Sequence, residues 1–526
     1  MAQHDVDLQR WLDEFSSGPV KVAHSLCDRW AEEPSRIGLY YEEPSGHSEQ
    51  ITFAELRDRS QSFAGTLRKH GVSRRDRVAT LLPKRPELPI ATLGLWRLGA
   101  IHVPLFTAFG PDAIRFRIEN SGARVVVTDA ANRPKIPNIS GLTVLDVEGD
   151  WADEATVLDP LELAPDELFI LIYTSGTTGH PKGVEVPVRA LSSFAAYMSF
   201  GLDIRDDDVH WNVADPGWAY GLYYGLIGTL LIGRAPIYYN APFSPVTAYD
   251  VIRRHGVTNL AAAPTVYRAL RASGEAPDGL RLRAASSAGE PLNPDVITWA
   301  ERELGVPIHD QYGQTELGMM IINCHRDDLR RPLKPGSMGH AMPGFRAVVL
   351  DSEGRELGPG EQGEVAIDRD NSPLMWFSRY WREPDWTAKR FVSDRYYITG
   401  DAAETGDKGY FFFSARADDV ITSAGYRIGP FEVESSLMAH PAVAEAAAVG
   451  KPDELRGEVV KAFVVLKADA RASDDLAAEL SEFVKRRLSA HAYPREVEFV
   501  AELPKTPSGK VQRFLLRSRE AATASA

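Results

Sequence analysis

The sequence predicts an α/β protein in which a large N-terminal part is followed by a small β-rich unit and a C-terminal α+β domain. Two patterns lead to this prediction: short apolar runs that alternate with helical stretches, and a later change to strands separated by turn residues. At roughly 150 residues per domain, the 526 residues should form three or four compact units. The composition, 44% hydrophobic and 25% charged, is that of a globular protein.

An amphipathic helix is predicted at 52–69. It starts with a capping box, in which Glu55 follows Thr52 at the third position, and it ends near Gly71. Short apolar runs separated by helical stretches are typical of parallel strands that are buried on both faces. These runs lie at 78–82, 124–128, 169–173 and 260–263.

Strands around turn residues predict the β-rich unit at 347–367. Within it, 358–363 has the G-x-G-x-x-G spacing of a dinucleotide-binding loop, but that loop needs a helix after it. Here proline interrupts the stretch and strand-like residues follow, so we expect a hairpin turn. Beyond Arg416 the pattern predicts helices at 430–439 and 475–488 and strands at 444–449, 459–466 and 497–500.

Charge and cysteine content narrow the classes of function. The chain has 59 Lys+Arg against 73 Asp+Glu, and the net charge of -14 disfavours binding to nucleic acid. Cys27 and Cys324 are the two cysteines, too few for a disulfide framework or a paired-cysteine zinc site. The N-terminus lacks the basic start and apolar core of a secretory signal, so we expect a cytoplasmic protein.

One uncharged run, 216–233, is long enough to suggest a membrane helix. Five glycines lower its hydrophobicity, Asp215 and Arg234 bound it, and no second such run exists in the sequence. We therefore expect a buried segment and no membrane span.

A loop rich in glycine and hydroxyl groups follows the apolar run at 169–173. Glycines let backbone N–H groups come close to phosphates, hydroxyls add donors, and a lysine adds positive charge. The loop is not a Walker A loop, because the Gly-Lys-Ser/Thr ending is absent. Its candidate phosphate-binding residues are Thr174, Ser175, Gly176, Thr177, Thr178, Gly179 and Lys182.

Five motifs, in order along the chain, resemble the signature motifs of the adenylate-forming acyl-CoA synthetases. They lie at 173–183, 311–316, 397–401, 416–427 and 507–510. The resemblance spans nearly the whole chain, and 214–219, 289–293 and 425–434 look closest to the medium-chain acyl-CoA synthetases, relatives of acetyl-CoA synthetase.

The resemblance implies the adenylate-forming enzyme fold. An N-terminal adenylation domain, 1–417, would hold the ATP, Mg²⁺ and acyl sites, and a mobile C-terminal domain, 418–526, would rotate about a hinge at Asp418. In this family one active site serves two steps because the small domain turns a different face toward it in each step.

The implied activity is that of an ATP-dependent carboxylate:CoA ligase. A carboxylate oxygen attacks the α-phosphate of ATP, giving an acyl-adenylate and pyrophosphate, and the thiol of coenzyme A then displaces AMP. The implied acid is a short- to medium-chain fatty acid or a similar acid. An adenylating enzyme that passes its acyl group to a carrier-protein thiol or an amine shares these motifs and is the alternative. A non-catalytic protein that binds acyl-nucleotides is an alternative of another class.

The resemblance also implies roles for single residues. Glu316 would bind Mg²⁺ and Thr315 a phosphate, while Lys510 would bridge the carboxylate and the α-phosphate as the catalytic lysine. Tyr312 would stack on adenine and Asp401 would accept hydrogen bonds from the ribose hydroxyls. The remaining residues implied at the ATP/AMP site are Gly289, Glu290, Pro291, Gln311, Gly313, Arg416 and Arg427.

The acyl and CoA sites are implied by fewer residues. Trp218, Gly221 and Gly313 would line the acyl pocket, and Gly313 stands where acetate-specific relatives have tryptophan, which implies space for longer acids. Gly425 would guide CoA. Lys510 also ends a P-x-x-x-x-G-K pattern that resembles the substrates of protein lysine acetyltransferases, so such an enzyme is an expected partner.

Overall fold

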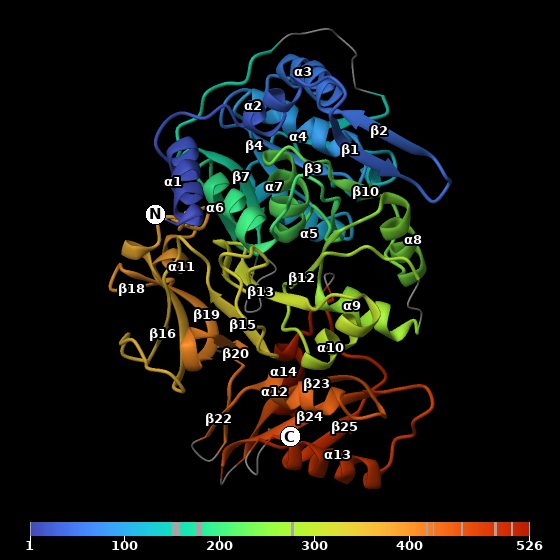
Figure 1. The fold of residues 1–526 in the computed structure, drawn as a ribbon, viewed down its shortest axis with the longest axis vertical. Coiled ribbons are helices and arrows are strands. Elements are labelled where there is room, and N and C mark those ends of the chain that lie inside the picture. The colour runs from blue at the N-terminus through green and yellow to red at the C-terminus, as the bar shows by residue number, and fades with distance from the viewer. Residues whose placement is uncertain are drawn as a thin grey trace.

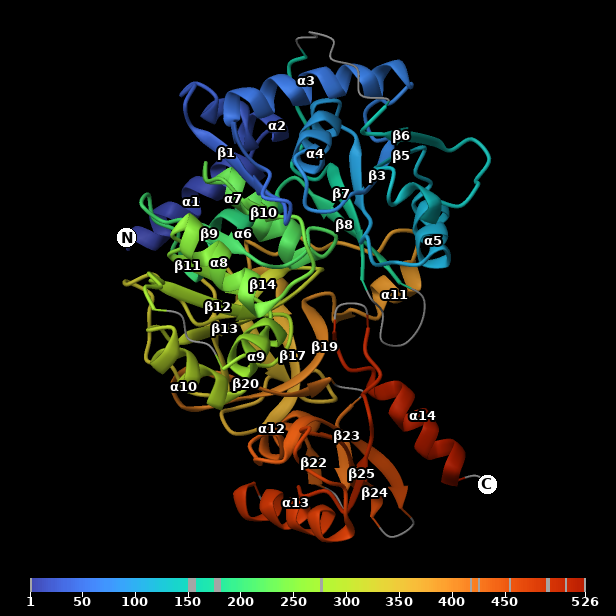
Figure 2. The same cartoon turned by 90° about the vertical axis from the view of Figure 1, so that its right-hand side faces the viewer.

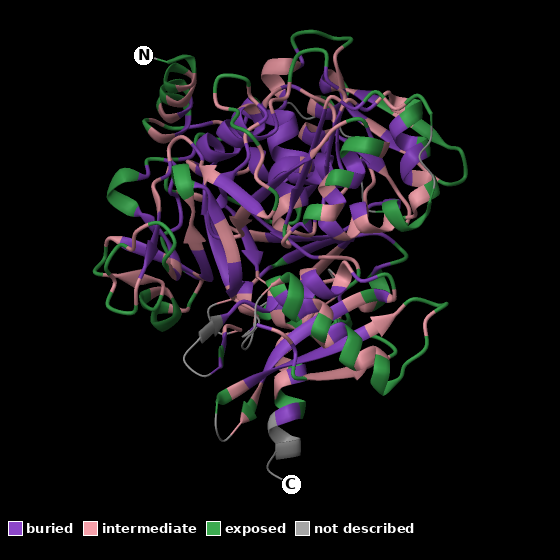
Figure 3. Cartoon of the chain, turned by 60° about the horizontal axis from the view of Figure 1, so that its bottom comes forward, coloured by how far each residue is buried: buried purple, intermediate pink, exposed green. Residues whose placement is uncertain are grey.

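The computed structural model describes residues 2–149, 158–174, 181–274, 278–416, 419–423, 426–453, 456–488, 492–506 and 509–524. The side chains of 426, 427 and 521–524 are not described. Two α/β layers and a β-rich part form a large body, and a smaller C-terminal body lies at one end of it (Figure 1). The strands in the middle of each body are buried, and the exposed residues lie mainly on loops and outer helix faces (Figure 3).

A six-stranded sheet forms the first layer. Its strands are parallel except for an antiparallel β7–β8 hairpin. Three of the four predicted apolar runs form strands here, so that prediction is confirmed. In order across the sheet the strands are β6 (Thr143–Asp146), β5 (Val125–Thr128), β3 (Arg77–Leu81), β4 (Ile101–Pro104), β7 (Leu168–Tyr173) and β8 (Gly183–Pro187).

The second sheet has eleven strands and joins the second α/β layer to the β-rich part. Strands β9, β11, β12 and β13 pair in parallel, and the hairpins of the β-rich part continue from them through β14 and β15. Its strands are β16 (Ala347–Leu350), β17 (Gln362–Asp368), β19 (Tyr396–Thr405), β20 (Phe411–Arg416), β15 (Ser337–Ala341), β14 (Gly318–Ile322), β13 (Ile308–Gln314), β12 (Ala284–Ala288), β11 (Asn259–Ala262) and β9 (His210–Asn212), with β18 (Phe391–Val392) beside β19.

The predicted hairpin turn at 358–363 is confirmed, because it joins β16 to the antiparallel β17. A small third sheet places β1 (Ile37–Glu42) between β10 (Ile237–Tyr239) and β2 (Ser48–Thr52). The helices of the large body are α1 (Gln3–Ser16), α2 (Val22–Leu26), α3 (Phe53–Lys69), α4 (Glu87–Arg97), α5 (Pro111–Ser121), α6 (Ala190–Ala196), α7 (Gly228–Leu231), α8 (Pro245–His255), α9 (Pro264–Ala272), α10 (Pro294–Glu303) and α11 (Pro384–Ala388).

The predicted capping box starts α3. The Thr52 hydroxyl accepts a hydrogen bond from the Glu55 N–H at 3.1 Å, and the Glu55 carboxylate accepts one from the Thr52 N–H at 2.7 Å. Two of the N–H groups that a helix start leaves unpaired are therefore satisfied by side chains.

The uncharged run at 216–233 is largely buried, and much of it forms a π-helix, η4 (Gly221–Ile227), followed by α7. A side chain at Gly221 would collide with the Asp215 carbonyl, and one at Gly228 would lie 2.8 Å from the Met198 sulfur, so these glycines allow close packing. No helix in the described part of the chain combines the length and the apolar character needed to cross a bilayer.

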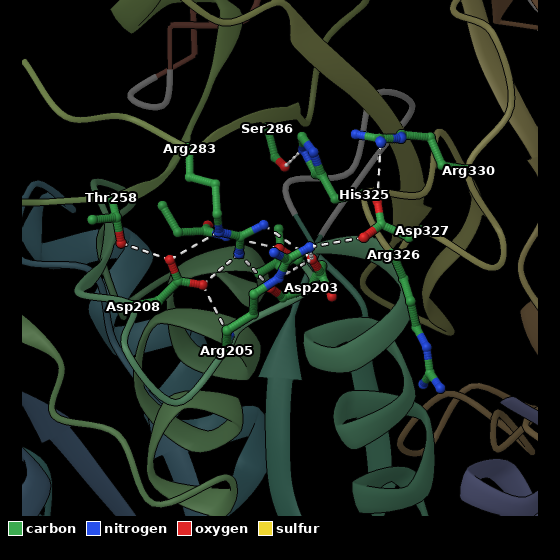
Figure 4. A network of polar contacts seen from close by, with 12 residues as sticks. Asp203, Arg205, Asp208, Thr258, Arg283, Ser286, His325, Arg326, Asp327 and Arg330 are labelled. Carbon is green, nitrogen blue, oxygen red and sulfur yellow. Dashed lines mark hydrogen bonds and ion pairs between the residues drawn. The ribbon is translucent and has the colours of Figure 1, made fainter. Parts of the chain in front are cut away.

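Ion pairs hold together the N-terminal ends of the strands in the second α/β layer (Figure 4). Arg283, just before β12, contacts Asp208, just before β9, and also Asp203, whose carboxylate lies 2.9 Å away. The Thr258 hydroxyl, just before β11, donates to Asp208 at 2.6 Å. The opposite, C-terminal ends of these strands are left free of this network, and ligands of α/β proteins bind at such ends.

The C-terminal body has its own five-stranded sheet and its own core. The predicted helices and strands are present at nearly the predicted bounds, and α14 runs along one side (Figures 1 and 2). The elements are β21 (Ile421–Ser423), β22 (Tyr426–Ile428), α12 (Pro430–Met438), β23 (Val443–Asp453), β24 (Gly457–Leu466), α13 (Asp474–Arg487), β25 (Glu496–Phe499) and α14 (Arg513–Ala524).

Contacts between the two bodies are formed by α12. The Asn293 side-chain amide donates to the Ser435 hydroxyl at 2.7 Å, and the rings of Phe413 and Phe431 lie 6.3 Å apart. Glu432 faces Glu404 across the same boundary: burial raises the pKa of Glu432, and the charge of Glu404 raises it further. Along α12, an attractive polar bond is therefore opposed by a repulsive pair of carboxyl groups.

A buried ion pair in the first layer should be important for stability. Arg97 is 1% exposed, donates to Asp28 and also donates to the Ser60 hydroxyl at 3.0 Å. Asp28→Asn should lower the free energy of unfolding by about 3–5 kcal/mol, because it leaves a buried guanidinium without its counter-charge. Urea unfolding followed by circular dichroism measures the change.

The matched control is Asp58→Asn, which removes an exposed carboxylate that pairs with Arg57 at 2.8 Å. Exposed pairs contribute about 0–1 kcal/mol, so this variant should unfold nearly as the parent does. Equal effects of the two substitutions would contradict the importance of the buried pair.

Candidate functional site

Several of the predicted site residues come together at the C-terminal ends of β12 and β13 and on the neighbouring β19 and β20. Gly289 follows β12, the 311–316 motif ends β13, Asp401 lies in β19, and Arg416 ends β20. In the register of β19 and β20, Asp401 and Arg416 stand opposite each other. Sheet pairing therefore brings together residues that are far apart in the sequence.

The carboxylate of Asp401 is the meeting point of three donors. The Tyr312 hydroxyl donates to it at 2.6 Å, the Gln314 amide at 2.8 Å and the Arg416 guanidinium at 2.9 Å. Asp401 is only 4% exposed, and Tyr397 holds Gln314 in place by donating to its carbonyl oxygen at 3.0 Å. Burial raises the pKa of Tyr312 well above its usual value, and the nearby Asp401 charge raises it further, so the phenol remains a donor.

A second group surrounds Glu316. The Tyr380 hydroxyl donates to the Glu316 carboxylate at 2.6 Å, and the Nε of Arg390 donates to the Tyr380 oxygen at 3.0 Å. Among the described residues, Tyr380 is the only hydrogen-bond donor to this carboxylate. Glu316 is 6% exposed, and on the other side of its turn the Tyr223 hydroxyl of η4 donates to the Thr315 carbonyl at 3.0 Å.

Lys182 lies at the base of the β7–β8 hairpin, whose loop is the predicted phosphate-binding loop. The Thr174 N–H donates to the Lys182 carbonyl at 2.9 Å and closes that base. The Lys182 amine rests 3.6 Å from the ring centre of Trp386 on α11. Burial lowers the pKa of Lys182, and the positive charge of Arg390 lowers it further.

In the 289–293 loop, the backbone at Gly289 is uncovered and the Glu290 side chain is held by a hydrogen bond. Gly289 has φ +100, and no atom lies within 4 Å of where a Cβ would be, so a flat ring can approach this backbone. The Glu290 carboxylate accepts a hydrogen bond from Arg268 at 2.8 Å. Next to this loop, burial raises the pKa of Asp310 to about 8, and Asp310 lies on the same side of β13 as Tyr312.

The Lys510 loop reaches from the C-terminal body to the large body. Lys510 is exposed, and its N–H donates to the Thr506 hydroxyl at 3.1 Å. A Cβ at the neighbouring Gly509 would lie 3.8 Å from Thr265 on α9, so the loop lies near the first turn of that helix. Behind it, Arg513 anchors α14 by donating to Glu434 at 2.6 and 2.8 Å.

Other predicted residues are not placed at this site by the structure. Ser175, Gly176, Thr177, Thr178, Gly179, Asp418 and Gly425 lie outside the described residues, as does the side chain of Arg427. Pro291 is half-buried in the 289–293 loop, and Gln311 is buried on β13, where its amide donates to the Asn323 carbonyl at 3.2 Å. The roles of these residues remain predictions.

The acyl-pocket argument needs a correction. A side chain at Gly313 would collide with the Gly318 carbonyl and lie 2.7 Å from the Cα of Met319, so the backbone of β14 fills the space that we expected to be open. Trp218 packs instead against Phe106 and Phe109, with ring centres 5.1 and 5.5 Å away. The close β13–β14 pairing, which includes a register shift after Tyr312, explains the glycine without an acyl ligand.

Sequence reasoning missed four residues that contact the predicted ones: Gln314, Tyr380, Trp386 and Arg390. Gln314 lies inside the 311–316 motif, and its amide could have been identified as a partner for a carboxylate. The other three lie at 380–390, where two aromatic residues and an arginine near a short helix give no motif signal.

Comparison with known proteins agrees with this geometry. The family model of AMP-binding enzymes matches residues 27–381, and the model of the AMP-binding enzyme C-terminal domain matches 432–510. The acetyl-coenzyme A synthetase of Bacillus subtilis is 38% identical over 96% of this chain and 91% of its own length. The mitochondrial acyl-coenzyme A synthetase ACSM3 of Pongo abelii is 35% identical, with 95% and 89% covered.

Solved structures give the same result. A Brucella canis acyl-CoA synthetase is 46% identical, covers 100% of both chains and superposes with a TM-score of 0.76. ATP-bound MatB from Rhodopseudomonas palustris is 29% identical and superposes with a TM-score of 0.84, with 94% of this chain and 98% of that chain covered. The match to one family model over 27–381, together with relatives that are similar over nearly their full length, shows that this chain belongs to the family of AMP-binding enzymes.

Proposed function

We propose that this protein, an ATP-dependent acid:CoA ligase that works through an acyl-adenylate, activates a short- to medium-chain fatty acid or a similar acid in the cytoplasm. One observation supports the assignment of the site most directly. Tyr312, Asp401 and Arg416 form a single hydrogen-bonded cluster around the buried Asp401 carboxylate, and Glu316 lies two residues beyond Gln314, which belongs to that cluster.

The cluster suits a nucleoside monophosphate. Asp401 fixes the orientation of the Tyr312 ring through the phenol, so the ring can serve as a rigid platform for adenine, facing the open backbone of Gly289. A carboxylate offers about four acceptor positions, and three donors already contact Asp401, so it retains capacity for a ribose hydroxyl. The same carboxylate thus serves both the base and the sugar.

Adenylation needs positive charge around the α-phosphate. In the attack of the acid's carboxylate on that phosphorus, both reactants are anionic, and the transition state spreads further charge over the phosphoryl oxygens. Lys182, Arg416 and the incoming Lys510 are the cations that would neutralise it. No protein nucleophile is required, because the carboxylate is itself the nucleophile.

The residues present fit Mg²⁺. Glu316 offers a hard carboxylate oxygen that is fixed by Tyr380, and Mg²⁺ usually takes one or two protein carboxylates and completes its shell with phosphates and waters. Glu316 would hold the ion, and the bound ion would supply charge neutralisation of the ATP phosphates. Tyr380 would contribute by holding the Glu316 carboxylate in one orientation.

The second step transfers the acyl group to CoA. The alternative acceptors, a carrier-protein thiol or an amine, share the adenylation residues, so a direct comparison of CoA with a carrier domain as acceptor distinguishes them. A non-catalytic acyl-nucleotide-binding protein would bind ATP without acid-dependent exchange of pyrophosphate into ATP.

Lys510→Ala should separate the two half-reactions. Loss of one positioned charge at a transition state costs roughly 10² to 10³ in rate, so acid-dependent pyrophosphate exchange should fall by that factor. Thioester formation from a supplied acyl-adenylate should remain, because the acyl group is already activated. Equal loss in both assays would contradict the assignment of Lys510 to adenylation alone.

A panel of acids tests the proposed substrate class. Acids of four or more carbons should exceed acetate at least tenfold in kcat/KM, since a pocket gains about 1–3 kcal/mol per methylene that it accommodates. CoA-dependent release of AMP measures this on the unchanged protein. A Gly313 variant is not suitable, because any side chain there would displace β14. A preference for acetate would contradict the substrate class and leave the ligase activity standing.

Acetylation of Lys510 should switch the enzyme off. The side chain is exposed in its loop, and an acetyl group would remove the charge that adenylation uses. Mass spectrometry of protein treated with a lysine acetyltransferase should find the modification together with lost pyrophosphate exchange, and a deacetylase should restore the exchange. Fully acetylated protein with full activity would contradict this prediction.

A further inference from the structure

We propose that Arg390 binds the β- and γ-phosphates of ATP, the part that leaves as pyrophosphate, as a second cation beside Lys182. This inference rests on the ligase function proposed above. Arg390 lies outside all five motifs by which the site was predicted, immediately after α11 and before β18. Its place in the site follows from contacts, charge balance and the way its backbone is held.

The contacts bring Arg390 to the centre of the site. One chain of hydrogen bonds runs from its Nε to the Tyr380 oxygen at 3.0 Å and from the Tyr380 hydroxyl to Glu316 at 2.6 Å. On another side, a Cβ at Gly400 would lie 2.9 Å from the Nη1 of Arg390 and 3.4 Å from the Nη2 of Arg416. Arg390 therefore lies between the predicted Mg²⁺ ligand and the arginine that contacts Asp401.

The positive charges of Arg390 and Lys182 could be neutralised by a bound anion. Arg416 is paired with Asp401 at 2.9 Å. Among the described residues, no carboxylate forms a direct ion pair with Arg390 or Lys182, and Arg390 reaches the Glu316 carboxylate only through the Tyr380 hydroxyl. Lys182 rests on the Trp386 ring instead. Half-buried charges that lack a counter-ion are costly, and a polyphosphate between the two cations would supply that counter-ion.

The backbone of Arg390 is held in place by a neighbouring strand. The Ile398 N–H of β19 donates to the Arg390 carbonyl at 2.8 Å, so the residue is tied to the strand that carries Asp401. The Tyr380 ring packs against Phe377, with centres 5.0 Å apart, and keeps the donor chain in an apolar setting. Preorganised donors in such surroundings bind developing negative charge more strongly than donors in water.

A positioning role is the rival explanation, since Arg390 also contacts Tyr380 and could act only by steadying Glu316. The two roles differ in their dependence on Mg²⁺. A phosphate ligand binds pyrophosphate with or without the metal, whereas a residue that acts through Glu316 matters only when Mg²⁺ is present. Binding measured in EDTA separates them.

The test uses calorimetric titration of the full chain with ATP, inorganic pyrophosphate and AMP, each in Mg²⁺ and in EDTA. Arg390→Gln should lower the affinity for ATP and for pyrophosphate roughly tenfold or more in both buffers, because hydrogen bonds to charged groups contribute about 1.5–3 kcal/mol. Its affinity for AMP should stay within about twofold, as AMP lacks the β- and γ-phosphates. Arg390→Lys should recover part of the affinity, since it keeps the charge and loses the planar fork.

Arg369→Gln is the matched control, because it removes an exposed arginine on the 3₁₀ helix Arg369–Asn371 of the same β-rich part. It should leave all three affinities unchanged. Tyr380→Phe should lower the affinity for ATP in the presence of Mg²⁺ and leave pyrophosphate binding in EDTA nearly unchanged.

Three results would overturn the proposal. The first is that Arg390→Gln binds ATP and pyrophosphate as tightly as Arg369→Gln does, and the second is that its loss of affinity disappears in EDTA. The third is a loss of affinity for AMP equal to that for ATP. Should Arg390→Gln fail to fold, the Arg390→Lys titrations decide by the same criteria. Failure of the ligase proposal would show itself differently, as a parent protein that binds ATP but makes no acyl-CoA from any acid.

Discussion

The site depends on the hydrogen bonds that the buried carboxylate of Asp401 accepts. It fixes the Tyr312 ring from β13 and the Arg416 guanidinium from β20, and the position of Arg416 follows from the pairing of β19 with β20. Bonds in which one partner is charged are about twice as strong as neutral ones, so this carboxylate locks three side chains at a small cost in side-chain freedom. Loss of the carboxylate would release the Tyr312 ring and the Arg416 guanidinium together.

In the second sheet, the two ends of the parallel strands carry different kinds of contact. At the N-terminal ends of its parallel strands, Arg283 and Asp208 form ion pairs that hold neighbouring strands in register. At and just beyond the C-terminal ends, the hydrogen bonds are made by groups that also suit ligands, such as Tyr312 near the end of β13 and Glu316 in the turn after it. Rigid pairing at one end of these strands helps the other end to hold a precise geometry.

Much of this arrangement could be predicted from the sequence, because its signals are local. Apolar runs gave the parallel strands, and the capping box at Thr52 gave the start of α3. The opposition of Asp401 and Arg416 could not be predicted, since it depends on the register between two strands rather than on spacing along the chain. Gly313 was misread for a related reason: its missing side chain indicates a close approach of β14, which only the fold reveals.

The 380–390 segment shows a different limit. Tyr380, Trp386 and Arg390 are ordinary residues for a turn and a short helix, and they contact predicted site residues only because the β7–β8 hairpin and the 311–316 turn come close to them in space. Motifs identify residues that a family shares. They give no signal for residues that lie outside them, such as these three.

The boundary between the two bodies has an energetic consequence. The Asn293–Ser435 hydrogen bond is opposed by the carboxyl groups of Glu404 and Glu432, so part of the attraction across this boundary is cancelled by charge repulsion. A ligand shifts a balance of states only by its difference in affinity between them. When the intrinsic bias is small, a difference of about 1.4 kcal/mol, tenfold in affinity, already changes which state dominates. In the rotation that the family resemblance implies, the occupancy of the nucleotide site would then determine which face the small body presents.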